Sequence, residues 1–347
     1  MHTTPQAAGP TAAPKPEPAH HSPRLLQLDG WRGLSICAVL AAHLAPVGPG
    51  SWLLNQASGV FGMALFFTLS GYLITSFLLA KPDIKSFLIR RCLRILPLAW
   101  LLMLIVAFLA PTDVANSVLR FLFLQNYHDS AATVYTAHLW SLCVELHFYF
   151  GVALLVALGG RGALRVLPWF ALAVTGWRIA EGATLSILTH FRVDEILAGA
   201  CLALLGAGQL PAVLRKPFER VSPWVWLVCL AAASHELTGP LNYVRPYFGA
   251  LVVGSTLFQP NHSINTLLKT RVLNYLATVS YAVYVIHGPL TTGWFHETNL
   301  AVKYLIKRPI TLILTFALAH VSTFYWESRW IALGQRLTSK RPAAKAA

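Results

Sequence analysis

Long apolar stretches alternate with short polar segments along most of this chain. Ten stretches have the length and composition of membrane-spanning helices, although several are close to the lower limit of about 17 residues. They are predicted at residues 31–48, 57–79, 95–111, 138–158, 166–180, 191–207, 223–239, 242–258, 272–295 and 308–330. The pattern predicts an all-α fold, a polytopic integral membrane bundle of about ten transmembrane helices.

The composition supports a membrane location, because 56% of the 347 residues are hydrophobic and only 12% are charged. Soluble domains carry about 25% charged residues. The net charge of +14 would suit a protein that binds nucleic acid, but the basic residues fall between the apolar stretches. Most of them lie in segments predicted on the same side of the membrane as the N-terminus. Cytoplasmic loops are enriched in lysine and arginine, so we expect an N-in, C-in orientation. The chain is therefore predicted to be a multi-pass protein of the plasma (inner) membrane that binds no nucleic acid.

One folded domain is expected between two tails. Residues 1–23 are rich in proline, alanine and threonine, which cannot build a core, and are predicted to be a disordered N-terminal tail. Residues 24–335 contain all ten stretches and form the transmembrane domain, and residues 336–347 form a basic cytoplasmic tail. The five cysteines lack the spacing of metal ligands, so no metal site is predicted.

The first apolar stretch carries two ionisable residues, Arg32 and His43, eleven positions apart. Eleven residues of α-helix turn about 1,100°, close to three full turns, and rise about 16 Å. Both side chains therefore share one helix face, with Arg32 near the membrane boundary and His43 deep in the apolar span. Such groups usually face a bundle interior or a wet cavity. There the histidine can act as a general base and the arginine can hold an anion. The alternatives are an interfacial anchor for Arg32 and a structural interhelical hydrogen bond for His43.

Three arginines precede the third stretch, in the segment RRCLRILP. Arg91 and Arg94 are one helical turn apart, and Arg90 stands beside them. Guanidinium groups in such a cluster bind phosphates well, so these residues are candidates for an anionic donor or cofactor. Ordinary positive-inside charge is the alternative explanation.

Other ionisable residues occur within the apolar stretches. Glu145 lies inside the fourth stretch and needs a nearby histidine or arginine as a partner; a catalytic role and an ion pair that fixes the bundle both account for it. Gly199 in the sixth stretch is predicted to permit a close helix approach. His287, beside a Gly-Pro pair, is interpreted as a packed polar residue. Three charged residues of the sixth stretch are predicted to fix the bundle: Arg192, Asp194 and Glu195.

Six motifs in the right order resemble the membrane-bound acyltransferase 3 family, over nearly all of residues 25–335. LDGWRG with His43 is similar to the opening LDGLRG…H of that family, FGMALFFTLSGYLIT to its second-helix pattern, and RRCLRILP to its R-x-x-R pair. HLWSLCVELHFYF, SYAVYVIHGPL and FYWESRW are similar to its later segments. The chain departs from the pattern at Leu146 and His147, where Glu and Gln are usual, and at Ser328 and Arg329, where Arg and Pro are usual.

The resemblance implies an integral-membrane O-acyltransferase that works in the lipid bilayer. Such an enzyme moves an acyl group, most often acetyl, from cytoplasmic acyl-CoA to a hydroxyl of a carbohydrate or glycosylated acceptor. The family roles fall on Arg32 and His43 as the R-x10-H pair and on Arg91 and Arg94 as the R-x-x-R pair.

In the mechanism that we expect, His43 removes the proton of the acceptor hydroxyl while the hydroxyl attacks the thioester. Glu145 orients or neutralises the imidazolium, and Arg90 or Arg32 helps to hold the CoA phosphates. The competing interpretation is a transporter or flippase of an anionic or glycosylated substrate, which would use the same buried charges along a permeation path.

Overall fold

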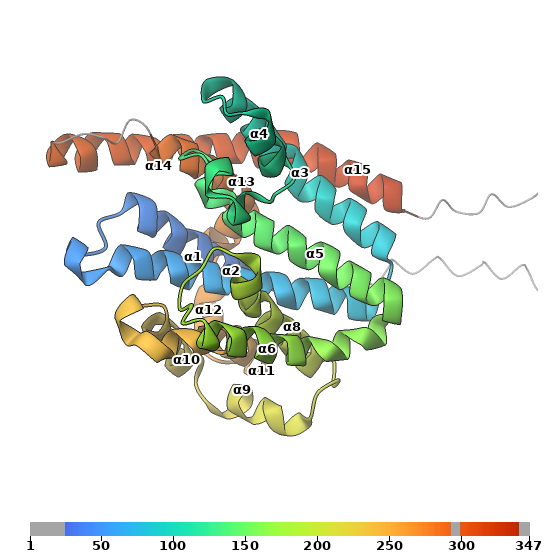
Figure 1. The fold of residues 1–347 in the computed structure, drawn as a ribbon. Coiled ribbons are helices and arrows are strands. Elements are labelled where there is room, and N and C mark those ends of the chain that lie inside the picture. Colours follow the sequence, from blue (N-terminus) through green and yellow to red (C-terminus); the bar gives the residue numbers. More distant parts are fainter. Residues whose placement is uncertain (1–24, 293–298, 340–347) are drawn as a thin grey trace, which may run out of the picture.

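The computed structural model describes residues 25–292 and 299–339. The predicted tail at residues 1–23 and the end of the predicted basic tail, residues 340–347, lie outside the described residues. Within the described ranges the chain is helical and contains no strand (Figure 1). The α-helices are α1 (Leu26–Leu44), α2 (Leu54–Ala80), α3 (Ile84–Leu109), α4 (Val114–Phe121), α5 (Trp140–Gly159), α6 (Leu167–Ala180), α7 (Thr189–Arg192), α8 (Asp194–Gly206), α9 (Lys216–Arg220), α10 (Pro223–Ala233), α11 (Arg245–Phe258), α12 (Ile264–Leu268), α13 (Arg271–Thr291), α14 (Arg308–Val321) and α15 (Ser328–Thr338).

Shorter helical turns connect these helices. The π-helical segment η8 leads into α14, and a second one, η9, joins α14 to α15, so that Val302–Thr338 is one continuous helix. The 3₁₀ turns are η1 (Gly50–Trp52), η2 (Gln125–Tyr127), η3 (Asp129–Ala131), η4 (Ala137–Leu139), η5 (Arg161–Val166), η6 (Ala212–Arg215) and η7 (Glu236–Val244), and the π-helical segments are η8 (Val302–Lys307) and η9 (Ser322–Glu327).

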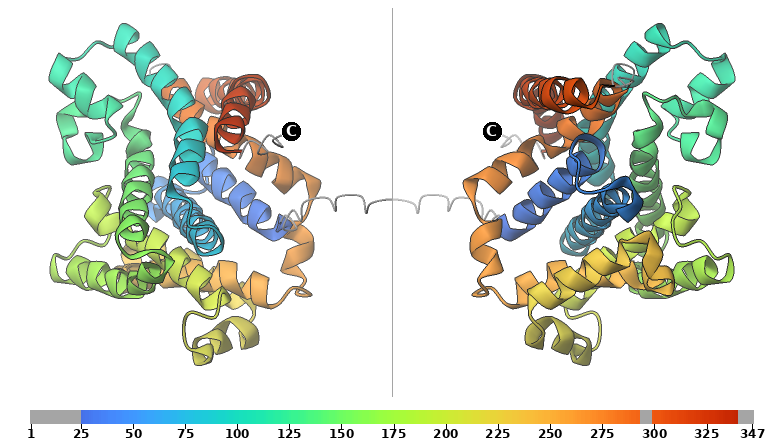
Figure 2. Two further views of the ribbon diagram at one scale, coloured as in Figure 1. Left: turned by 90° about the vertical axis from the view of Figure 1, so that its right-hand side faces the viewer. Right: turned by 90° about the vertical axis from the view of Figure 1, so that its left-hand side faces the viewer.

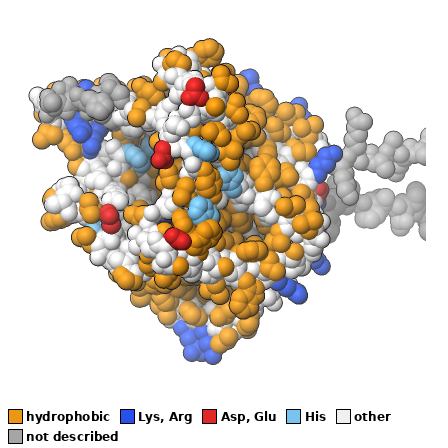
Figure 3. Space-filling model, in the orientation of Figure 1, with side chains coloured by type: hydrophobic (Ala, Val, Ile, Leu, Met, Phe, Trp, Pro, Cys, Tyr) orange, Lys and Arg blue, Asp and Glu red, His pale blue; other side chains and the backbone are white. Residues whose placement is uncertain are grey.

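The surface of the bundle is apolar over a broad band. Figure 3 shows hydrophobic side chains across most of the visible face, with lysines and arginines gathered toward its edges. Phe108 of α3 and Leu158 of α5 are 80% and 81% exposed. By length and composition, four of the described helices can cross a membrane: Leu54–Ala80, Ile84–Leu109, Ala137–Gly159 and Val302–Thr338. The count of about ten spans and the N-in, C-in orientation stay predictions.

Helices α1 and α2 lie near the middle of the bundle, with the other helices around them (Figure 2). Helix α1 packs against α2 and α13, and α2 packs against α1 and α8. Small residues allow these close contacts: a Cβ atom on Gly199 of α8 would overlap the carbonyl of Thr68 in α2, and one on Gly71 would overlap the carbonyl of Ile196. The close helix approach predicted at Gly199 is therefore confirmed.

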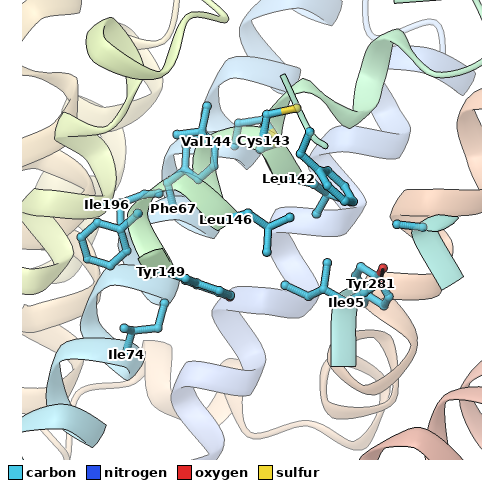
Figure 4. Close-up of a cluster of buried hydrophobic side chains, with 14 of the residues drawn as sticks. Phe67, Ile74, Ile95, Leu142, Cys143, Val144, Leu146, Tyr149, Ile196 and Tyr281 are labelled. Atoms are coloured by element: carbon cyan, nitrogen blue, oxygen red, sulfur yellow. Dashed lines mark hydrogen bonds between the residues drawn. The ribbon is translucent and has the colours of Figure 1, made fainter. Parts of the chain in front are cut away.

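The larger hydrophobic core lies between α2, α3, α5, α8 and α13, and Figure 4 shows part of it. Phe67 and Ile74 of α2 pack there with Tyr149 of α5. The hydroxyl of Tyr281 in α13 donates to the carbonyl of Ile95 in α3, which ties these two helices together inside the core.

The third helix begins earlier than the pattern predicted, at Ile84 rather than near residue 95. Asp83 caps it: the Asp83 carboxylate accepts hydrogen bonds from the backbone N–H of Ser86 at 3.0 Å and from the Ser86 hydroxyl at 2.7 Å. As a result, the arginine cluster sits inside α3 and not in the segment before it.

The predicted span at 223–239 is not one helix. Helix α10 ends at Ala233, and Gly239 takes a positive φ of 54°, which an L side chain rarely adopts. The hydroxyls of Ser234 and Thr238 donate to the carbonyls of Leu230 and Ala232, at 2.7 and 2.9 Å, and satisfy the end of the helix. The helix therefore stops short of the predicted end.

Candidate functional site

Helix α1 carries both residues of the R-x10-H pair. It runs without a break from Leu26 to Leu44, so Arg32 and His43 lie on one helix face about 16 Å apart along its axis, as the spacing predicts. Gly30 and Gly33 let the backbone of α1 touch its neighbours, since a Cβ atom on either would overlap the carbonyl of Leu268 or Leu273. Arg32 and His43 are thus held on a helix whose backbone directly contacts neighbouring backbone.

His43 lines a cavity of about 490 Å³ at the C-terminal end of α1. Helices α1 and α2, η4, the start of α5, α7 and α13 all contribute to its wall. Among the residues that the structure describes, no aspartate or glutamate lines this cavity. Its polar lining consists of Asn55, Gln56, His138, Trp140, Arg192 and Tyr284 as well as His43.

The hydrogen bonding of His43 leaves one ring nitrogen available as a base. Its Nδ1 atom lies 2.9 Å from the carbonyl oxygen of Val39. A carbonyl only accepts, so the neutral ring carries its hydrogen on Nδ1 and keeps a lone pair on Nε2. That is the protonation state which a general base requires before reaction.

Arg32 meets the arginines of α3 at the other end of the helix pair. It lies within electrostatic range of Arg91, Arg94 and Glu145, and the Arg91 guanidinium is 5.8 Å from the centre of the Tyr149 ring. The arginines of α3 also line a cavity of about 210 Å³, together with Ile331 and Gln335 of α15. Two motifs that are far apart in the sequence therefore form one basic cluster.

The three arginines of RRCLR differ in their surroundings. The Nε of Arg90 donates to the Thr338 hydroxyl of α15 at 2.7 Å. Among the described residues, Arg32, Arg91 and Arg94 have no hydrogen-bond partner, so their guanidinium groups remain available to an anion. Arg90 serves at least partly to tie α3 to α15.

Glu145 belongs to the end with the arginines. It is 4% exposed, accepts a hydrogen bond from the Ser70 hydroxyl at 2.7 Å and accepts another from the Tyr149 hydroxyl. It does not line the cavity of His43, and in the described residues no contact joins it to His43. Arg32 is the arginine within electrostatic range of this carboxylate, and the catalytic role of Glu145 stays a prediction.

The charged residues near the start of α8 form buried ion pairs. Arg178 of α6 pairs with Asp194, and Glu195 lies 2.7 Å from Arg245 of α11 and 3.4 Å from Arg192. The predicted bundle-fixing role of this segment is consistent with these contacts, which link α6, α7, α8 and α11. Arg192 also reaches the cavity of His43, where its guanidinium is 5.5 Å from the centre of the Trp140 ring.

Sequence reasoning missed several residues of the cavity. His138 was not singled out, although it is the first residue of HLWSLCVELHFYF, and Tyr284 belongs to the SYAVYVIHGPL motif that was recognised only as a resemblance. The Ser141 hydroxyl donates to the Tyr284 hydroxyl at 2.6 Å, and Tyr284 donates in turn to the His138 carbonyl. No group of three or more His, Cys, Asp or Glu in the described ranges is placed to hold a metal ion.

Comparison with known proteins adds a family and several relatives. A model of the acyltransferase domain family matches residues 25–324. The chain is 25% identical to the peptidoglycan O-acetyltransferase of Listeria monocytogenes over 350 aligned residues, which cover 87% of the chain and 55% of that protein. It is 26% identical to a putative peptidoglycan O-acetyltransferase of Bacillus subtilis over 371 aligned residues, 90% of the chain and 56% of that protein.

A putative O-acetyltransferase of Staphylococcus aureus is 25% identical over 369 aligned residues, 91% of the chain and 59% of that protein. The chain thus spans a little more than half the length of the curated relatives that it matches. No solved structure matches it.

Proposed function

The chain belongs to the acyltransferase domain family, and we propose that it is an integral-membrane O-acyltransferase with two connected half-sites. The donor half-site consists of Arg32, Arg91 and Arg94, and the acceptor half-site is the cavity of His43. It moves an acyl group, specifically acetyl, from acyl-CoA to a hydroxyl of a carbohydrate acceptor. The relatives carry the names of peptidoglycan O-acetyltransferases, so a glycan of the cell wall is the first acceptor class to test. The proposed location is the plasma membrane, with acyl-CoA bound from the cytoplasm.

One observation carries this proposal: helix α1 connects a basic cluster to a cavity that holds a free imidazole nitrogen. Arg32 lies near Arg91 and Arg94, and His43 lines the 490 Å³ cavity three helical turns further along. An acyl-CoA molecule has phosphates at one end and its thioester at the end of a long arm. A donor bound along α1 would place its anionic end on the arginines and its thioester beside His43.

The chemistry then follows from the state of His43. Its Nε2 lone pair takes the proton of the acceptor hydroxyl while the hydroxyl oxygen attacks the thioester carbonyl carbon. The C–S bond breaks, and the leaving thiolate receives the proton from His43, so the transfer is balanced within the ternary complex. Asn55 and Gln56 at the cavity wall offer hydrogen bonds to the hydroxyls of a sugar.

The direct test uses the full chain reconstituted in liposomes, with radiolabelled acetyl-CoA and soluble peptidoglycan fragments as acceptor. We expect label on the glycan and loss of thioester that depends on the presence of acceptor. Identical liposomes without protein supply the background rate. A transporter or flippase would instead move the glycan or the anion across the bilayer and leave the thioester intact, which would contradict the proposal.

Loss of one arginine in the donor half-site is expected to weaken acetyl-CoA binding. Arg91→Ala or Arg94→Ala should each cost about 1.5–3 kcal/mol, because each removes a charge-assisted hydrogen bond to phosphate. That corresponds to a roughly 10- to 150-fold higher Kd, measurable by equilibrium binding of acetyl-CoA to the protein in detergent.

Lys85→Ala is the matched control, since it removes one positive charge from an exposed position about two turns earlier on α3. We expect its Kd to stay close to that of the unchanged protein. If both arginine variants bind acetyl-CoA as tightly as the unchanged protein does, the arginines do not bind the donor and represent only positive-inside charge.

A further inference from the structure

Three histidine rings from distant segments stand in a row beside the cavity. His43 of α1 and His287 of α13 have ring centres 5.0 Å apart, and His287 and His138 of η4 have ring centres 5.1 Å apart. His287 stands between the other two and is 0% exposed. Gly288 makes room for this arrangement, because a Cβ atom there would overlap the His138 ring.

Backbone carbonyls fix the neutral form of the two inner rings. The Nδ1 of His287 lies 2.6 Å from the Tyr284 carbonyl oxygen, and the Nε2 of His138 lies 3.1 Å from the Val285 carbonyl oxygen. Each of these nitrogens must donate, because a carbonyl only accepts. The remaining nitrogens, Nε2 of His287 and Nδ1 of His138, therefore carry lone pairs.

Neither lone pair has a partner. Both nitrogens are buried, and neither has a hydrogen-bond partner among the residues that the structure describes. A buried acceptor without a partner costs stability, and such groups are rare in folded proteins. These two lie beside the expected base, where a requirement for acceptors arises during the reaction.

That requirement is the positive charge which His43 acquires. A proton on His43 Nε2 creates a cation, and no carboxylate lines the cavity in the described part of the chain. Glu145 is engaged by Ser70 and Tyr149. The other charged group at the cavity, Arg192, is itself a cation and lies 3.4 Å from Glu195.

We propose that His287 and His138 are positioning residues that stabilise the protonated form of His43 with their unpartnered lone pairs. They take the place that a carboxylate has beside many catalytic histidines, as preorganised dipoles close to a charge that develops in the transition state. They neither gain nor lose a proton: the proton passes from the acceptor hydroxyl to His43 and from His43 to the leaving thiolate. This inference rests on the proposed function and names the groups that support its base.

A pair of variants at each position separates this role from a structural one. An asparagine side chain reproduces the Nδ1 position of histidine, and a glutamine side chain reproduces the Nε2 position. His287→Asn and His138→Gln keep the hydrogen bond to the carbonyl but remove the lone pair. His287→Gln and His138→Asn place an amide oxygen where the lone pair was but lose the hydrogen bond to the carbonyl.

We expect kcat for acetyl transfer to fall about 10- to 100-fold in His287→Asn and His138→Gln, with KM for acetyl-CoA unchanged, because stabilisation is lost only when the charge develops. His287→Gln and His138→Asn should keep several-fold more activity. The more active variants are thus His287→Gln and His138→Asn, with glutamine favoured at one position and asparagine at the other. A general preference of the site for one amide side chain cannot give this opposite order. A structural role predicts the reverse order at both, and that result would overturn the inference.

Controls make the two levels of the proposal separable. Donor binding and thermal unfolding of each variant show whether it is folded. If a variant at His287 fails to fold, the pair at His138 still tests the inference, and the reverse holds as well. His320→Asn, on an exposed surface of α14, should transfer at the rate of the unchanged protein. If the unchanged protein transfers no acetyl group, the proposed function fails. If it does transfer and the order of variants is reversed, only the inference about His287 and His138 fails.

Discussion

The His43→Ala protein is expected to bind acetyl-CoA almost normally and to transfer acetyl groups about 10²–10⁴-fold more slowly, the usual contribution of a positioned general base. Binding should persist because His43 lies three helical turns from the arginines of the donor half-site. Transfer should fail because no other free nitrogen at the cavity of His43 is as accessible: His287 is fully buried, and the free nitrogen of His138 is buried. The measurements are equilibrium donor binding and the rate of labelled acetyl transfer to glycan.

The control is His320→Ala, which removes an imidazole from an exposed position outside the cavity. Folded His43→Ala protein that still transfers at a near-normal rate would remove His43 from the mechanism. Loss of assembly in place of loss of turnover would favour the structural interpretation, in which His43 only hydrogen-bonds within the bundle.

Neutralising Glu195 should produce a large loss of stability. Glu195→Gln keeps the size of the side chain but leaves Arg245 and Arg192 without their carboxylate at buried positions. Removing one partner of a buried ion pair costs about 3–5 kcal/mol, because the remaining charge stays desolvated and uncompensated. The free energy of unfolding in mixed detergent micelles, from denaturation with sodium dodecyl sulfate, measures this loss.

Glu181→Gln provides the comparison, since Glu181 is exposed and accepts only a 3.4 Å hydrogen bond from Trp177. Its free energy of unfolding should change by no more than about 0.5 kcal/mol. Equal stability of the two variants would mean that water reaches the charges of α8 and that they do not fix the bundle.

The basic cluster shows which contacts the spacing along one helix predicts and which it does not. The eleven-residue interval from Arg32 to His43 depends only on the regular geometry of an α-helix, and α1 has that geometry. The arginine pair at Arg91 and Arg94 was recognised for the same reason. That Arg32 joins this pair depends on how the bundle places α1 relative to α3, which the spacing along one helix does not determine.

Glu145 illustrates the opposite case. A carboxylate in an apolar stretch predicts a partner but does not identify it. The structure surrounds Glu145 with the hydroxyls of Ser70 and Tyr149 and places it within electrostatic range of Arg32, away from the cavity of His43. Support for the imidazole comes instead from His287 and His138, which stand in two of the recognised motifs but far from His43 in the sequence.

The sequence alone determined the helical class, the apolar character, the face shared by Arg32 and His43, and the family. These properties depend on composition, on a period of 3.6 residues and on the order of short motifs, all of which are local. Tertiary structure decided which segments meet: Glu195 with Arg245, and His43 with His287 and His138. Such contacts are set by the packing of helices against one another, where residues far apart in the chain become neighbours only after the small side chains of α1, α2 and α8 let the backbones approach.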